Sequence, residues 1–201
     1  MGELRDSKKR ETRQRISDVA TKLFFARGFE AVTIEEIAAA AKVSKMTVFN
    51  YFARKEELFL DREDEVKQLL HRALAERPKG QDPIDALRAL VDRLRAEKHP
   101  FARVDDQTVG WWRIVAASAS LKARVRDIGD EAVEALAVEL AGPRADGLAR
   151  LVAGMIVLTW RTAYAEAVRV FAGGGSARKA SATFVELIDR GFAAVRGLAD
   201  R

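Results

Sequence analysis

The segment that decides the fold is residues 27–58, which read RGFEAVTIEEIAAAAKVSKMTVFNYFARKEEL. Gly28 follows an apolar helical stripe and fits a left-handed helix C-cap. Thr33 and Glu36 have the spacing of a capping box, which predicts a short helix starting there. After a tight turn, Ser44 can cap a third helix of similar length. A longer helix followed by two short helices joined by a tight turn predicts a helix-turn-helix unit.

The rest of the chain is predicted to be helical as well. Alanine, leucine, arginine and glutamate dominate it, and no alternating β-branched segment is found. Apolar periodicity predicts helices at about 8–27, 34–40, 44–51, 55–75, 83–98, 104–118, 120–140, 144–172 and 176–198. The predicted fold is therefore all-α with about nine helices. It divides into an N-terminal three-helix helix-turn-helix domain (1–55) and a C-terminal helical domain (56–201).

The positive charge of the chain is concentrated near its N-terminus. Residues 1–55 hold 12 Lys/Arg and 7 Asp/Glu, which leaves 23 of each for residues 56–201. This asymmetry indicates an N-terminal module that meets a polyanion, joined to a neutral module with another task. A basic, solvated tail is the alternative that charge alone leaves open.

The third predicted helix carries side chains suited to reading base edges. Val48 lies on its inward face, which leaves Lys45, Met46, Thr47 and Asn50 facing outward. Lysine can donate to guanine, asparagine can pair with adenine through two hydrogen bonds, and threonine can bond or place its methyl against thymine. The alternative for Lys45 is an ordinary solvated side chain.

Three further residues are candidates for contacts to the DNA backbone. Thr33 and Lys55 lie at predicted helix N-termini, where free N–H groups favour a phosphate. Tyr51 adds a hydroxyl on the same side. Capping alone also explains Thr33, and Tyr51 can simply pack.

Composition excludes several other classes of function. The chain has no cysteine and only His71 and His99 as imidazoles, so no metal site, cofactor or thiol nucleophile is predicted. The acidic pair Asp105–Asp106 lies at a predicted helix start, where capping explains it. No catalytic residue is therefore predicted, and a helical enzyme remains a minor alternative. The longest strongly apolar run, residues 151–160, is shorter than the roughly 20 residues that span a bilayer. No membrane partner is expected, and we expect a cytoplasmic location.

The segment 27–58 resembles the DNA-binding signature of the TetR family of bacterial transcriptional regulators. The matching elements are Gly28-Phe29, Thr33, Ile37-Ala38, Val43-Ser44, Thr47, Phe49-Asn50-Tyr51-Phe52 and Lys55-Glu56-Glu57-Leu58. With the side chains above, the resemblance implies a double-stranded DNA operator as partner and DNA contacts from Thr33, Lys42, Ser44, Lys45, Met46, Thr47, Asn50, Tyr51 and Lys55. The chain departs from the family at Lys42 and Met46, where glycine is common, and at Phe49, where tyrosine is common. A left-handed Lys42 would cost about 1 kcal/mol.

The resemblance also implies that the C-terminal domain dimerises through its last two helices and binds a small molecule. The expected function is a homodimeric repressor that an apolar or aromatic effector releases from a palindromic operator. The predicted dimer interface comprises Ala163, Ala167, Phe184, Leu187, Ile188, Gly191, Phe192 and Val195. The predicted effector pocket comprises His99, Phe101, Trp111, Trp112, Met155, Trp160 and Arg161. Packing within one chain is the alternative for both sets, and a DNA-binding dimer without an effector is the alternative function.

Overall fold

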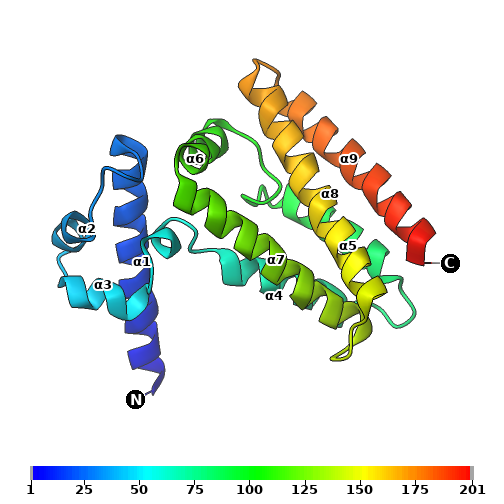
Figure 1. Cartoon of the computed structure of the whole chain (residues 1–201), viewed down its shortest axis with the longest axis horizontal. Helices are drawn as coiled ribbons and strands as arrows, with labels where there is room; N and C mark the ends of the chain where they lie inside the picture. Colours follow the sequence, from blue (N-terminus) through cyan, green and yellow to red (C-terminus); the bar gives the residue numbers. More distant parts are fainter. Residues whose placement is uncertain (1, 200–201) are drawn as a thin grey trace. The chain divides into compact units, whose positions relative to one another are not determined.

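The computed structural model describes residues 2–199, and this part of the chain is entirely helical. Its nine α-helices and one 3-10 helix (Figure 1) are α1 (Gly2–Arg27), α2 (Ile34–Ala40), α3 (Lys45–Tyr51), η1 (Lys55–Leu58), α4 (Glu63–Ala75), α5 (Pro83–Ala96), α6 (Asp106–Ala117), α7 (Ala119–Ala141), α8 (Gly147–Ala172) and α9 (Ala177–Ala199). No strand occurs among the described residues. The predicted all-α fold class is confirmed.

The chain forms two compact units. The first comprises Met1–Glu63 together with Trp111–Arg124, and the second comprises Asp64–Gly110 together with Val125–Arg201. In the first unit, α2 contacts both α1 and α3, and η1 contacts α1. In the second unit, α8 and α9 make the most extensive helix pair. The division into domains at residue 55 stays a prediction.

Local capping defines the short helices of the first unit. Gly28 has a φ of +83°, the left-handed conformation expected of a helix C-cap. The Thr33 hydroxyl accepts a hydrogen bond from the backbone N–H of Glu36, and the Glu36 carboxylate accepts from the backbone N–H of Thr33. Ser44 accepts from the backbone N–H of Thr47. The three predicted caps are confirmed. They could be predicted because each depends on residues only a few positions apart.

The helix predicted at 55–75 is wrong as one continuous element. The chain forms η1, then a non-helical turn at 59–62, and only then α4. Leu58, Phe59 and Leu60 are all buried. Successive α-helical residues are 100° apart, so three consecutive side chains span about 200° and cannot share one buried face. The break lets the first unit bury all three.

The second unit is built around the antiparallel pair of α8 and α9 (Figure 1). Ala163 and Ala167 of α8 are fully buried, and so are Phe184 and Ile188 of α9, which lets the two helices pack closely. Helix α5 covers α9 and is joined to it by ion pairs, one of them between Arg88 and Asp189. Small residues such as Ala163 and Ala167 allow α8 and α9 to pack at a short interhelical distance.

Gly191 of α9 lies against Thr159 of α8, with no room for a larger residue. A Cβ atom at this position would lie 2.2 Å from Thr159 Cγ2, and Thr159 is short and β-branched. We therefore expect Gly191→Ala to destabilise the second unit by about 1–3 kcal/mol. Gly197→Ala in the same helix meets nothing within 4 Å and serves as the control. Urea denaturation of both variants checks this, and equal stabilities would contradict the proposed close contact.

Helix α8 is longer than the apolar run on which the membrane expectation rested. An 18-residue window within it reaches a mean hydropathy of 1.2, which by length and composition alone is enough to cross a membrane. About 28% of that window is buried, and the buried residues of the helix include Ala149, Ala153, Ala163 and Ala167. Its apolar character is explained by this buried face together with an exposed leucine face, described below.

Candidate nucleic-acid interface

Helix α3 presents one inward and one outward face. Val48 is fully buried, whereas Met46 and Asn50 are exposed and Thr47 is half-buried. At 100° per residue, Met46, Thr47 and Asn50 lie within about 100° of one another, on the side opposite Val48. The predicted recognition face is therefore brought together on one side of this helix.

The turn between α2 and α3 places two further predicted residues at the edge of this face. Lys42 has a φ of +54°, so the expected left-handed lysine is confirmed. Its side chain and that of Ser44 are exposed. The Ser44 hydroxyl lies 2.8 Å from the Thr47 hydroxyl, and this pairing orients both groups at the start of α3. Each hydroxyl retains capacity for a further hydrogen bond to an outside partner.

Lys45 is held by α2. Its ammonium contacts the Glu35 carboxylate and lies 5.9 Å from the centre of the Phe49 ring. The hydrogen bond from Lys45 lowers the pKa of Glu35 below its ordinary value. The ion pair is exposed, so its contribution to stability is small. Reading a guanine would require Lys45 to exchange this partner for the base.

Thr33 is fully engaged in the capping box. Its backbone N–H donates to Glu36 Oε2 at 2.7 Å, its hydroxyl interacts with the same carboxylate, and Arg27 pairs with Glu36 at 2.8 Å. The hydrogen bond from the Thr33 backbone, followed by those from Arg27 and the Thr33 hydroxyl, lowers the pKa of Glu36 to about 2. A phosphate that approached Thr33 would compete with the Glu36 carboxylate for the backbone N–H and hydroxyl of Thr33.

We expect the stabilising effect of Glu36 to disappear in acid. Because its folded pKa lies below the unfolded value of about 4.3, its contribution is complete above pH 4.3 and is lost as pH falls towards 2. The melting temperature of Glu36→Gln should therefore lie below that of the native chain at pH 7, and the gap should close towards pH 2. Glu11→Gln, at an exposed site on α1, is the control. A pH-independent gap would contradict this assignment.

Lys55 lies at the start of η1 and faces the first unit's own aromatic residues. Its ammonium donates to the Phe29 carbonyl at 2.6 Å and lies 4.3 Å from the centre of the Phe29 ring. Burial lowers the pKa of Lys55, and the carboxylates of Glu30, Glu56 and Glu36 partly oppose this effect. A structural role for Lys55 is therefore visible beside its predicted phosphate contact.

Two features of this surface were missed by the sequence analysis. Phe49 is an exposed apolar side chain on α3, and the sequence pointed only to the tyrosine that is common at this position. Its spacing of three residues from Met46 was an available signal, because such residues are neighbours on a helix. The pairing of Glu35 with Lys45 joins two helices and has no signal in the local pattern.

One comparison with known proteins concerns the same segment. The family model described as bacterial regulatory proteins, tetR family, matches residues 16–61. Residues 16–61, which include α2, α3 and η1, are therefore similar to the DNA-binding segment of this family. The predicted resemblance is thereby confirmed. The chain is also similar to the HTH-type transcriptional regulator TcmR of Streptomyces glaucescens, with 38% identity over 96 residues. That alignment covers 46% of this chain and 42% of TcmR, so the chain spans less than half of this relative.

Solved structures extend the likeness in fold beyond the TetR-family domain. A protein from Mesorhizobium loti assigned to the TetR family has a TM-score of 0.57 and 21% identity, covering 92% of this chain and 95% of that one. NalD, the secondary repressor of the MexAB-OprM multidrug efflux pump in Pseudomonas aeruginosa, has a TM-score of 0.54 and 18% identity, with coverage of 92% and 97%. The helical arrangement of the second unit is therefore shared with TetR-family structures.

The predicted effector residues are divided between the two units, and their grouping into one pocket stays a prediction. Trp111 and Trp112 belong to the first unit, where Trp111 stacks on Phe59 with ring centres 5.4 Å apart. The other five belong to the second unit. There the Trp160 indole N–H donates to the Phe101 carbonyl at 3.3 Å. Surface hollows of about 580 and 420 Å³ lie beside the α4–α5 loop and along α1, and none of the predicted effector residues lines either.

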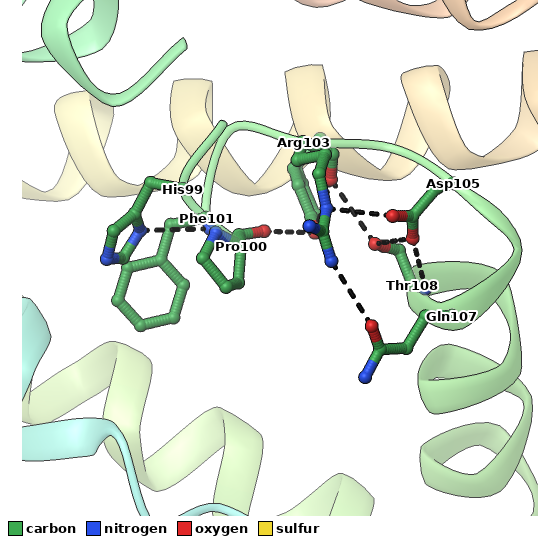
Figure 2. Close-up of polar contacts among 8 residues, drawn as sticks. His99, Pro100, Phe101, Arg103, Asp105, Gln107 and Thr108 are labelled. Carbon is green, nitrogen blue, oxygen red and sulfur yellow. Dashed lines mark hydrogen bonds and ion pairs between the residues drawn. The ribbon is translucent and has the colours of Figure 1, made fainter. Parts of the chain in front are cut away.

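His99 and Phe101 lie in a loop that is closed by its own polar contacts (Figure 2). Their rings are 5.0 Å apart, and His99 Nε2 lies 3.0 Å from Glu65. At the end of this loop, Arg103 pairs with Asp105 at 2.8 Å. Asp105 also accepts from the Thr108 backbone N–H, and this confirms that the carboxylate caps α6. These contacts connect the loop to α4 and to the start of α6.

The structure places most of the predicted dimer interface inside the single chain. Six of its eight members are buried inside the single chain: Ala163, Ala167, Phe184, Ile188, Phe192 and Val195. A side chain without exposed surface cannot bury more against a second copy, so these six belong to the α8–α9 core. Leu187 and Gly191 are half-buried, so both have surface left that can contact a second copy of the chain. The large apolar side chains that are exposed on α8 are Leu148, Leu151 and Leu158.

Proposed function

We propose that this chain is a DNA-binding transcriptional regulator that acts in the cytoplasm as a homodimeric repressor. The observation that carries the proposal is the outward face of α3, with Met46, Thr47 and Asn50 on a TetR-family domain. The major groove admits one α-helix, and these side chains match the donors, acceptors and methyl groups found there. The alternative of a helical enzyme finds no support in Asp105, which caps a helix.

The charge distribution supports an approach to DNA by the first unit. The excess of 12 Lys/Arg over 7 Asp/Glu lies within residues 1–55, which include all of α3. Each phosphate that these residues neutralise releases counterions, so affinity should fall steeply with salt. Lys42, at the turn before α3, is exposed and places one of these charges beside the recognition face.

The exposed face of α8 supports a homodimer. Leu148, Leu151 and Leu158 are each at least half exposed, and the partly buried Met155 lies between them on the helix. At 100° per residue these four occupy a sector of about 80°, turned away from the buried alanines. Leu187 of α9 is half-buried, so part of its apolar side chain is exposed as well. A stripe of this kind, apolar and exposed, is suited to a four-helix interface between two copies.

A symmetric dimer has a geometric consequence for its operator. Two recognition helices must enter major grooves on the same side of the duplex, so half-site centres should be about 34–36 Å apart or a multiple of this. We therefore propose a palindromic operator.

Selection of bound sequences from a random DNA pool tests this function. We expect enrichment of a palindrome by the native chain and a salt slope of about −0.9 per phosphate neutralised. Asn50→Ala should lose preference for adenine at one position per half-site, at about 1–3 kcal/mol for each bidentate contact. Gln14→Ala, at an exposed amide on α1, is the matched control and should keep the preference. No enrichment, or a flat salt dependence, would refute the proposal.

Release by a small apolar or aromatic effector is a finer part of this proposal. The aromatic side chains around Trp160 in the second unit are the candidates for such a contact. Coupling between two ligands is reciprocal, so the operator must weaken effector binding by the same factor by which the effector weakens operator binding. Titration of a compound found by thermal shift, with and without operator, tests this part. Equal affinities would favour the dimer without an effector.

A further inference from the structure

Helix α3 exposes two large apolar side chains on the surface that we propose meets DNA. Met46 is 68% exposed, more than any other large apolar side chain in the part of the chain that the structure describes, and Phe49 is 44% exposed. Exposed apolar surface is costly to leave in water, and a contiguous pair indicates a contact made on binding. The Met46 side chain is mostly free of contacts within the chain, and the Phe49 ring is partly covered, with the Lys45 ammonium 5.9 Å from its centre.

The two side chains form one surface next to Asn50. Phe49 and Asn50 follow Met46 by three and four residues, so both are its neighbours on the helix, with Cβ atoms about 5–6 Å apart. Lys45, on the other side of Phe49, has its ammonium at Glu35 of α2. The polar side chain next to Met46 one turn along the outward face is the Asn50 amide.

The chemistry of the major groove selects what this surface can contact. Among the groups that base pairs present there, the C5-methyl of thymine is the apolar one, and the others are hydrogen-bond donors and acceptors. Placing Met46 against a donor or acceptor would remove water from that group without replacing its hydrogen bond. The methionine side chain is flexible and polarizable, so it can adjust to a methyl group.

We propose that Met46 and Phe49 read a thymine methyl in each half-site, within two base pairs of the adenine read by Asn50. This inference rests on the proposed function, because it requires α3 to enter the major groove. Base steps are about 3.4 Å apart along one strand. A separation of 5–6 Å on the helix therefore corresponds to one or two steps.

Replacing thymine by uracil tests the inference, because it removes only the methyl group. A palindrome enriched from the random pool is synthesised with uracil at one symmetric pair of thymine positions at a time. At one pair, affinity should fall about fourfold per half-site and about fifteenfold for the dimer, as for about 0.8 kcal/mol per buried methyl. Met46→Ala should bind the thymine and uracil duplexes about equally at that pair, and Phe49→Ala should reduce the difference.

The control variant is Phe25→Ala, which shortens an exposed phenylalanine on α1. It should retain the full preference for thymine. A uracil effect that is absent at every position, or that persists unchanged in Met46→Ala, would overturn the inference while leaving DNA binding intact. If the pool yields no enriched sequence at all, the proposed function fails, and this inference fails with it.

Discussion

Replacing Leu151 and Leu158 together by glutamate should produce monomers that bind operator DNA at least a hundredfold more weakly. Both leucines are more than half exposed on α8, so the single chain should fold with either residue. A symmetric interface would bring four new carboxylates together, and burying unpaired charge is strongly unfavourable. The monomer would also lose the gain of about 10²–10⁴ that two linked binding sites provide.

Light scattering and operator titration measure these two effects. Val138→Glu is the matched control, because Val138 is 44% exposed on α7 rather than on α8. It should leave the dimer intact. A double variant that remains dimeric would exclude this face as the interface.

The buried positions of α9 should respond differently. Phe192 is 3% exposed within the chain, so a charged residue there should unfold the second unit as well as abolish dimerisation. The circular dichroism spectrum separates the two cases. The exposed leucine variants should retain their helical signal, whereas Phe192→Asp should lose part of it.

Lys55→Ala should destabilise the first unit by about 1.5–3 kcal/mol, the typical range for a hydrogen bond made by a charged group. The lost interactions are the 2.6 Å hydrogen bond to the Phe29 carbonyl and the contact with the Phe29 ring. Lys55→Met keeps the aliphatic stem and should recover only part of the loss. Phe29 lies near the start of the α1–α2 connection, so this bond supports the recognition unit.

Urea denaturation followed by tryptophan fluorescence measures this effect, because Trp111 stacks on Phe59 in the same unit. Lys22→Ala, at an exposed lysine of α1, is the control and should be nearly neutral. If Lys55 acted on phosphate alone, stability would be unchanged and only the salt slope of DNA binding would become shallower.

Much of the recognition unit was predictable from local sequence. The caps formed by Gly28, Thr33 and Ser44 depend on hydrogen bonds across three or four residues, and the outward side of α3 follows from helical periodicity around Val48. Such features are encoded where they occur. These caps and this periodicity therefore do not depend on distant residues. The TetR-family signature consists largely of such local features.

Only the tertiary structure decided where the helix after Leu58 breaks and which faces of α8 and α9 are buried. The break after Leu58 arises because three consecutive side chains are buried at once, and the partners that bury them come from distant parts of the sequence. Periodicity marked α8 and α9 as apolar, but only their packing shows that Phe184 and Phe192 face the core while Leu151 and Leu158 face solvent. A helix that is apolar on two sides offers two faces of similar hydrophobicity. Which face is buried within the chain depends on the fit of side chains across helices, and that fit is a property of the pair rather than of either sequence segment.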